Sequence, residues 1–104
     1  MHGRIAAAII ASGLIFSSAG AAGDTEQLCA KEWDGNFRMQ EYCIKKGQEG
    51  AADYRAIART YQANSAMSRA LSKCFQDWTE GGLTNWRMAA YCGRKQAESY
   101  ERLR

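Results

Sequence analysis

The sequence predicts an all-α fold in which two disulfide-stapled helical hairpins are joined by a long, bent middle helix. The chain contains no proline and no valine, while alanine, glutamine, glutamate, lysine and arginine are plentiful, so intrinsic preference favours helix over strand. No segment shows the alternation of apolar and polar residues that is typical of a half-buried strand. A short motif bounded by cysteines occurs twice, and it divides the chain into two similar halves.

The N-terminus is predicted to be a cleaved export signal that occupies residues 1–21. Arg4 provides a positive charge, residues 5–16 are mostly apolar, and residues 17–23 are small. An uncleaved membrane anchor is the alternative, but the apolar run is shorter than the roughly 20 residues that a span needs. Cleavage leaves residues 22–104 as a single small helical domain.

The repeated motif accounts for all four cysteines. The first copy is Cys29-Ala-Lys-Glu-Trp33 followed by Asn36-Phe-Arg-Met-Gln-Glu-Tyr42-Cys43, and the second is Cys74-Phe-Gln-Asp-Trp78 followed by Asn85-Trp-Arg-Met-Ala-Ala-Tyr91-Cys92. Seven of the thirteen paired positions are identical, and the second copy carries four extra residues in its middle. Four cysteines behind an export signal indicate disulfides, with three pairings possible. The duplication favours a bond within each copy, and each bond is worth about 3 kcal/mol.

The helices can be placed from their start and stop signals. We expect a first helix over residues 24–33, a second helical stretch over 36–79, and a last helix from Thr84 or Asn85 to the C-terminus. Because Gly47 and Gly50 fall on the buried line of the middle stretch, they indicate either a close helix approach or a bend, and we expect a bend. With few aliphatic residues in the mature chain and ten aromatic ones, the core is expected to be aromatic.

A stripe with three-four spacing follows the middle stretch. Its members are Tyr54, Ile57, Tyr61, Asn64, Ser68, Leu71, Phe75 and Trp78. Few obvious intramolecular partners exist for its first three residues, so they form a candidate binding face. The polar residues in the stripe indicate either a self-association seam or a part of the helix that faces solvent.

The motif resembles one that recurs in small exported bacterial proteins of unknown function, Cys-x3-Trp followed by Met-x2-Tyr-Cys-x3-Gln. The second copy matches it through Gln96, whereas the first has Gly47 at the last position. The resemblance implies a bacterial, exported, disulfide-bonded protein, periplasmic or secreted, and it carries no information about catalysis or ligands.

Several chemistries are disfavoured by what the chain contains. Its only histidine, His2, lies in the signal, so the mature protein has no imidazole for catalysis or metal binding. The cysteine spacings do not suit zinc, and no Cys-x-x-Cys is present for thiol exchange. We therefore predict no cofactor and no metal. The net charge of +3, which falls to +2 without Arg4, is too small to indicate nucleic-acid binding.

Two pairs of charged residues recur in the motif copies. Glu32 and Asp77 are candidate carboxylates for a cell-wall glycan hydrolase, but acid-to-arginine bridges, Glu32 to Arg38 and Asp77 to Arg87, explain their recurrence better. Tyr42 and Tyr91 are predicted to be core residues or to bond to a helix end.

The function that we predict is non-enzymatic. The chain is interpreted as an interaction or accessory module of the bacterial envelope that binds another envelope protein or a second copy of itself, with no membrane span after signal removal. A small-ligand carrier lined by Trp33, Trp78 and Trp86 is the other alternative, although core packing is the commoner role of such residues.

Overall fold

The computed structural model describes residues 23–104 and confirms an all-α fold with two disulfides. An N-terminal helix over residues 23–32 is followed by α2 (Phe37–Thr60), α3 (Ser65–Asp77) and α4 (Trp86–Leu103). Two short strands, β1 (Thr79–Glu80) and β2 (Leu83–Thr84), pair in antiparallel fashion before α4. The expected signal peptide, residues 1–21, lies outside the described residues.

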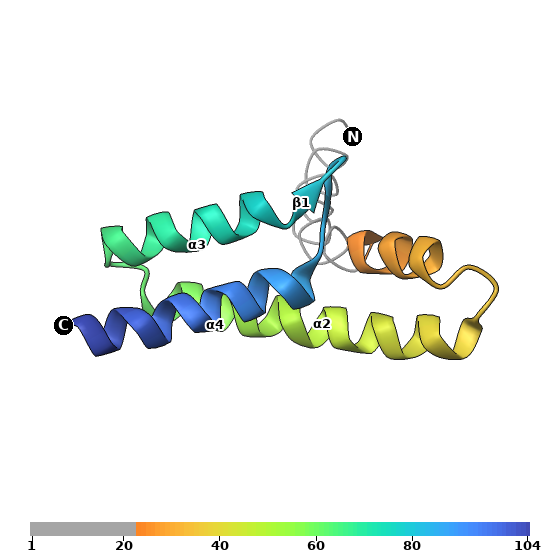
Figure 1. The fold of residues 1–104 in the computed structure, drawn as a ribbon, viewed down its shortest axis with the longest axis horizontal. Coiled ribbons are helices and arrows are strands. Elements are labelled where there is room, and N and C mark those ends of the chain that lie inside the picture. The colour runs from red at the N-terminus through yellow and green to blue at the C-terminus, as the bar shows by residue number, and fades with distance from the viewer. Residues whose placement is uncertain (1–22) are drawn as a thin grey trace, which may run out of the picture.

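The helices form two hairpins, and the second, made of α3 and α4, packs on α2 of the first. In Figure 1 the N-terminal helix, in orange, lies along the first half of α2, while α4 lies along its second half and α3 covers the far side of α4. Helices α2 and α4 run in the same direction, because Gly50 approaches Arg87 near the start of α4 and Tyr61 reaches Glu101 near its end. In the view of Figure 1, the incoming helix of each hairpin lies above its outgoing helix, so the two hairpins have the same orientation.

Each motif copy closes on itself through its own disulfide. Cys29 bonds to Cys43 with a Cα–Cα distance of 5.7 Å, and Cys74 bonds to Cys92 with a distance of 5.6 Å. These distances are typical of protein disulfides and pin the two helices of each hairpin side by side. The predicted pairing is confirmed.

The motif asparagine begins the outgoing helix in both copies. Asn36 Oδ1 accepts a hydrogen bond from the Met39 amide at 3.1 Å, and Asn85 Oδ1 accepts one from the Met88 amide at 3.2 Å. Both side chains satisfy an amide that the first helical turn would otherwise leave without a partner. The starts of α2 and α4 thus follow from a local signal that the sequence carries twice.

The expected bend between Gly47 and Gly50 is wrong. Helix α2 continues through both glycines and ends at Thr60, and the chain reverses over residues 61–64 before Asn64 caps α3. A Cβ on Gly50 would lie 2.7 Å from the Trp86 carbonyl oxygen, so this glycine permits the backbones of α2 and α4 to touch. Gly47 likewise faces the Thr25 side chain of the N-terminal helix. The glycines serve close approach, the alternative that the sequence left open.

The inserted residues of the second copy form a small β-hairpin. Gly81 and Gly82, with φ of +59° and +78°, make its turn, since a left-handed backbone disfavours other residues. Asp24 Oδ2 accepts a hydrogen bond from the Thr84 amide at 3.2 Å, which joins this hairpin to the N-terminal helix.

The core is stapled by the disulfides, but none of its buried apolar residues from residue 23 onward is aromatic. The buried apolar residues are Cys29, Ala51, Met67, Leu71, Cys74, Ala89 and Ala90. Helices that meet through glycine and alanine leave no room for rings between their backbones. Phe37 consequently lies at the margin and is 78 % exposed, whereas Tyr54 and Trp86 are half-buried beside the helix contacts.

Candidate functional site

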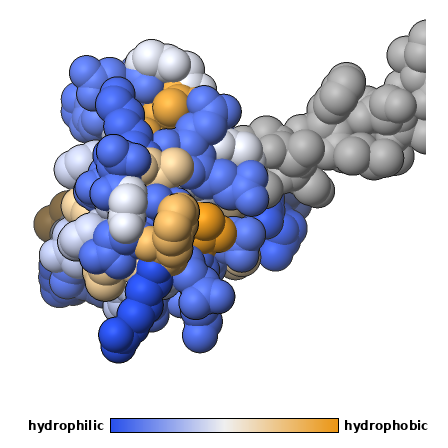
Figure 2. Space-filling model, turned by 90° about the vertical axis from the view of Figure 1, so that its right-hand side faces the viewer, coloured by the Kyte–Doolittle hydropathy of each residue, from blue (hydrophilic) through white to orange (hydrophobic). Residues whose placement is uncertain are grey.

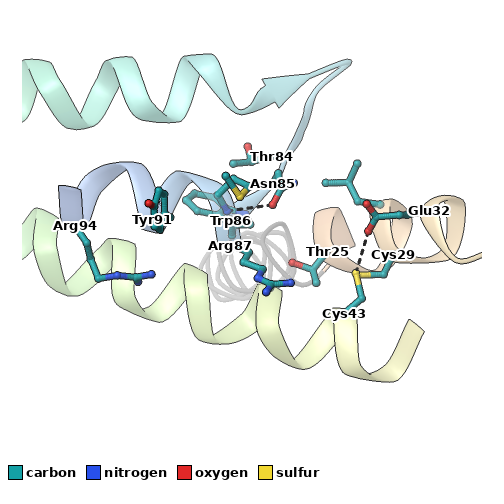
Figure 3. A pocket seen from close by; sticks show the side chains of 13 residues that line it. Thr25, Cys29, Glu32, Cys43, Thr84, Asn85, Trp86, Arg87, Tyr91 and Arg94 are labelled. Atoms are coloured by element: carbon teal, nitrogen blue, oxygen red, sulfur yellow. Dashed lines mark hydrogen bonds between the residues drawn. A yellow bond between two sulfur atoms is a disulfide. The ribbon is translucent and has the colours of Figure 1, made fainter. Parts of the chain in front are cut away.

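A groove of about 470 Å³ lies where the two hairpins meet on α2 (Figure 3). The N-terminal helix contributes one wall, α2 the floor, and the first half of α4 the other wall. Its lining includes Thr25, Leu28, Cys29, Glu32, Cys43, Gly47, Thr84, Asn85, Trp86, Arg87, Met88, Tyr91 and Arg94. The groove depends on the close approaches at Gly47 and Gly50, because these hold the two walls against the same floor.

Charged side chains of both signs border the groove. Glu32 Oε1 lies 3.8 Å from Cys43 Sγ (Figure 3), a contact and no hydrogen bond, since a disulfide sulfur carries no proton. Arg94 is paired with Asp53 at 3.2 Å. In Figure 3 the Arg87 side chain extends from α4 toward α2, and no ion pair engages it within the described part of the chain.

The tryptophans do not jointly line a binding space. Trp86 borders the groove, where its ring packs against Tyr54 at 5.4 Å and Phe75 at 5.7 Å between centroids. Its indole N–H is buried and has no hydrogen-bond acceptor among residues 23–104. Trp33 and Trp78 are absent from the groove lining, and Trp78 is 38 % exposed. A carrier site shared by all three tryptophans finds no support in this geometry.

The candidate binding face on α2 is occupied by the protein itself. Tyr54 donates a hydrogen bond to the Leu71 carbonyl at 2.6 Å, and burial raises the pKa of its hydroxyl. Ile57 lies beside Gly93 of α4. Tyr61 donates to Glu101 at 2.7 Å, a bond that raises the pKa of Tyr61 and lowers the pKa of Glu101. The premise that these residues lack intramolecular partners is therefore wrong.

The two candidate carboxylates lie in different surroundings. Glu32 borders the groove, whereas Asp77 ends α3 and pairs with Lys73 at 3.9 Å. The predicted acid-to-arginine bridges are wrong, since neither Glu32 with Arg38 nor Asp77 with Arg87 forms an ion pair among residues 23–104.

The surface carries a second repeated feature that sequence reasoning missed. Tyr42 and Tyr91 were expected to be core or bonded to a helix end, yet they are 48 % and 49 % exposed. A lysine one turn later, Lys46 or Lys95, lies 5.6 Å from the centroid of each ring. Each lysine in turn pairs at 3.4 Å with a glutamate three residues further on. The same tyrosine-to-lysine spacing in both copies was the available signal.

An arginine one turn before each tyrosine completes this feature. Positions four residues apart share a helix face, so Arg38, Tyr42 and Lys46 form one row on α2. Arg87, Tyr91 and Lys95 form the corresponding row on α4. We call these rows the first and second Arg-Tyr-Lys stripes. The second stripe borders the groove through Arg87 and Tyr91.

None of the helices from residue 23 onward combines the length and apolarity of a membrane span. Within the same residues, no cluster of three or more histidine, cysteine or acidic side chains is placed to hold a metal ion.

No protein-family model, no curated protein and no solved structure matches this chain. The assignment of a function therefore depends on the residues and their geometry.

Proposed function

We propose that this protein is an exported, non-enzymatic module of the bacterial envelope that binds a partner protein through its Arg-Tyr-Lys stripes. The single observation that carries the proposal is the exposure of Tyr42 and Tyr91, 48 % and 49 %, at equivalent positions of the two copies. Large aromatic side chains on a surface are enriched at protein interfaces, where they provide contact area at little entropic cost.

The cysteines and asparagines of the motif have evident roles in the fold. The cysteines form the disulfides, and the asparagines cap helices. Between these positions the two copies have diverged, as at Gln40 and Glu41, which are both alanine in the second copy. Retention of an exposed tyrosine in such a background supports a role in binding.

Apart from Phe37, which is 78 % exposed, the face of the first hairpin seen in Figure 2 is largely hydrophilic. Figure 2 shows the end of the molecule that lies at the right of Figure 1, where hydrophobic colour is confined to small islands. A broad apolar patch would suit an obligate interface, whereas isolated aromatic residues among polar ones suit a reversible one.

Export is supported by the apolar N-terminal run with its small-residue cleavage site and by the two disulfides, which persist in oxidising compartments. The resemblance of the motif to small exported bacterial proteins supports a periplasmic or secreted location. The glycan-hydrolase alternative loses support because Glu32 borders the groove and Asp77 does not, whereas a glycosidase needs both carboxyl groups to flank one bond.

Site-specific photo-crosslinking in the producing cells tests the proposal. A photoreactive amino acid at Tyr42 or Tyr91 should give one discrete cross-linked product, while the same group at exposed Arg69 on α3 should give none. Light scattering on the purified protein then distinguishes a foreign partner from a second copy. Absence of a product at both tyrosines, or an equal yield at Arg69, would contradict the proposal.

A further inference from the structure

The first stripe on α2 and the second stripe on α4 follow one another along the common direction of the two helices. Because α2 and α4 are parallel and Gly50 meets Arg87, the second arginine lies at the level of residue 50. That level is twelve residues beyond Arg38, which corresponds to about 18 Å at 1.5 Å per residue. Tyr91 follows Tyr42 at the same interval. The groove has Cys43 and Gly47 on its floor, next to the first stripe, and Arg87 and Tyr91 of the second stripe border it.

Only one charge in each stripe is left for a partner. Lys46 is paired with Glu49 and Lys95 with Glu98, both at 3.4 Å. Arg38 and Arg87 are exposed and have no ion pair within the described residues. Each stripe therefore offers one free guanidinium beside an exposed tyrosine ring.

A lack of ion pairing alone does not distinguish these arginines. Arg55, Arg59 and Arg69 are also without an ion pair among residues 23–104. Arg38 and Arg87 differ from them because they recur at equivalent positions, each one turn before an exposed tyrosine. A guanidinium binds a carboxylate through two parallel hydrogen bonds, and a neighbouring ring can pack against apolar atoms of the same partner.

The distribution of charge favours an acidic protein segment over a uniformly anionic surface. Glu49 and Glu98 cancel the charges of the lysines with which they pair, and Glu32 borders the groove. The stripes therefore offer two isolated guanidinium groups and no continuous positive surface that would suit a polyanion or an anionic membrane. Two separate carboxylates on a protein segment can bind the arginines and avoid the glutamates.

We infer that the two stripes bind one partner segment simultaneously, through two partner carboxylates about 18 Å apart that pair with Arg38 and Arg87. This inference rests on the proposed function and specifies its partner as an acidic segment bound at two points. Simultaneous binding turns the second contact into an intramolecular event, so two weak contacts give a much higher joint affinity.

Two synthetic helical peptides of equal composition test the inference. One carries its two glutamates eleven residues apart, about 17 Å on one face, and the other carries them four residues apart, about 6 Å. NMR titration of the full mature protein should show the wider peptide binding about tenfold more tightly. Arg38→Ala or Arg87→Ala should abolish the difference, and Arg69→Ala is the matched control that should leave it unchanged.

Several results would overturn the inference. They are equal affinity for the two peptides, binding of neither, or an equal effect of Arg69→Ala. Stronger, Arg38-dependent binding to phosphatidylglycerol vesicles would identify a lipid surface instead. If Arg38→Ala and Arg87→Ala leave the cross-linking yield at Tyr42 unchanged in cells, the acidic bivalent partner is wrong while the proposed function stands.

Discussion

The contact between α2 and α4 predicts that Gly50→Ala is strongly destabilising. A methyl group at this position would lie 2.7 Å from the Trp86 carbonyl oxygen and 2.8 Å from the Arg87 Cα and amide nitrogen. Favourable contact between such atoms needs about 3.5 Å, so α4 would have to move away by roughly 0.7 Å. All three obstructing atoms are backbone atoms, and a rotamer change cannot relieve them.

The magnitude follows from two opposing effects. Overpacking of a tight contact costs about 1–3 kcal/mol, with backbone obstruction at the upper end, while alanine gains about 1 kcal/mol over glycine in a helix. We expect a net loss of about 2 kcal/mol for Gly50→Ala. In a domain of this size that corresponds to a decrease in Tm of roughly 10 °C, measurable by far-UV circular dichroism with both disulfides intact.

Gly47→Ala is the matched comparison, since its methyl group would meet a side chain. The obstructing atoms belong to Thr25, including Oγ1 at 2.9 Å. Truncation by Thr25→Ala should therefore recover most of the stability lost in Gly47→Ala, whereas no side-chain truncation recovers Gly50→Ala. A Gly50→Ala protein as stable as the parent would refute the close approach and favour a bend in α2.

Three further predictions concern single side chains. Phe37→Ala should change the free energy of unfolding by less than about 0.5 kcal/mol, because Phe37 is exposed. Trp86→Ala at the equivalent position should cost about 3 kcal/mol, because Trp86 packs against two rings. Equal effects of the two substitutions in urea denaturation would contradict this prediction. Asn64→Ala should lower the free energy of unfolding by about 2 kcal/mol, because it removes both the α3 cap and the hydrogen bond to the Tyr100 hydroxyl. Asn64→Asp keeps the cap, so in thermal unfolding it should recover about half of that stability. The hydrogen bond from Tyr61 to Glu101 lowers the pKa of Glu101 and raises the pKa of Tyr61. The stability that this bond contributes is therefore lost as pH falls below 4.5, where Glu101 takes up a proton, and as pH rises above 10.0, where Tyr61 loses one. Tyr61→Phe should flatten both limbs of stability against pH, and an unchanged profile would count against the bond.

Features that depend on local chemistry could be predicted from the sequence. The disulfides follow from two copies of one motif, and the starts of α2 and α4 follow from Asn36 and Asn85, whose side chains cap amides three residues away. Asn64 caps α3 by the same geometry, with the Met67 amide at 2.9 Å. An asparagine is a typical helix-capping residue, but the position of Asn64 within an apolar stripe led to the prediction that the helix continues through it.

Features that depend on distant segments could not be predicted. Whether Gly50 bends a helix or admits another one is decided by α4, which begins 36 residues later at Trp86. Likewise, nothing in the sequence near Tyr54 and Tyr61 indicates that their hydrogen-bond partners come from α3 and α4. Periodicity identifies the buried side of a helix, but it does not identify what covers that side.

The two motif copies provide an internal comparison that bears on the site. Phe37 and Trp86 occupy equivalent positions, yet Phe37 is 78 % exposed while Trp86 packs against Tyr54 and Phe75. The surroundings of the two hairpins therefore differ enough to change the burial of a motif residue. Tyr42 and Tyr91 nevertheless have nearly the same exposure, 48 % and 49 %, and the same lysine distance of 5.6 Å. Exposure that persists across different surroundings belongs to the motif itself, as expected of a surface kept for binding.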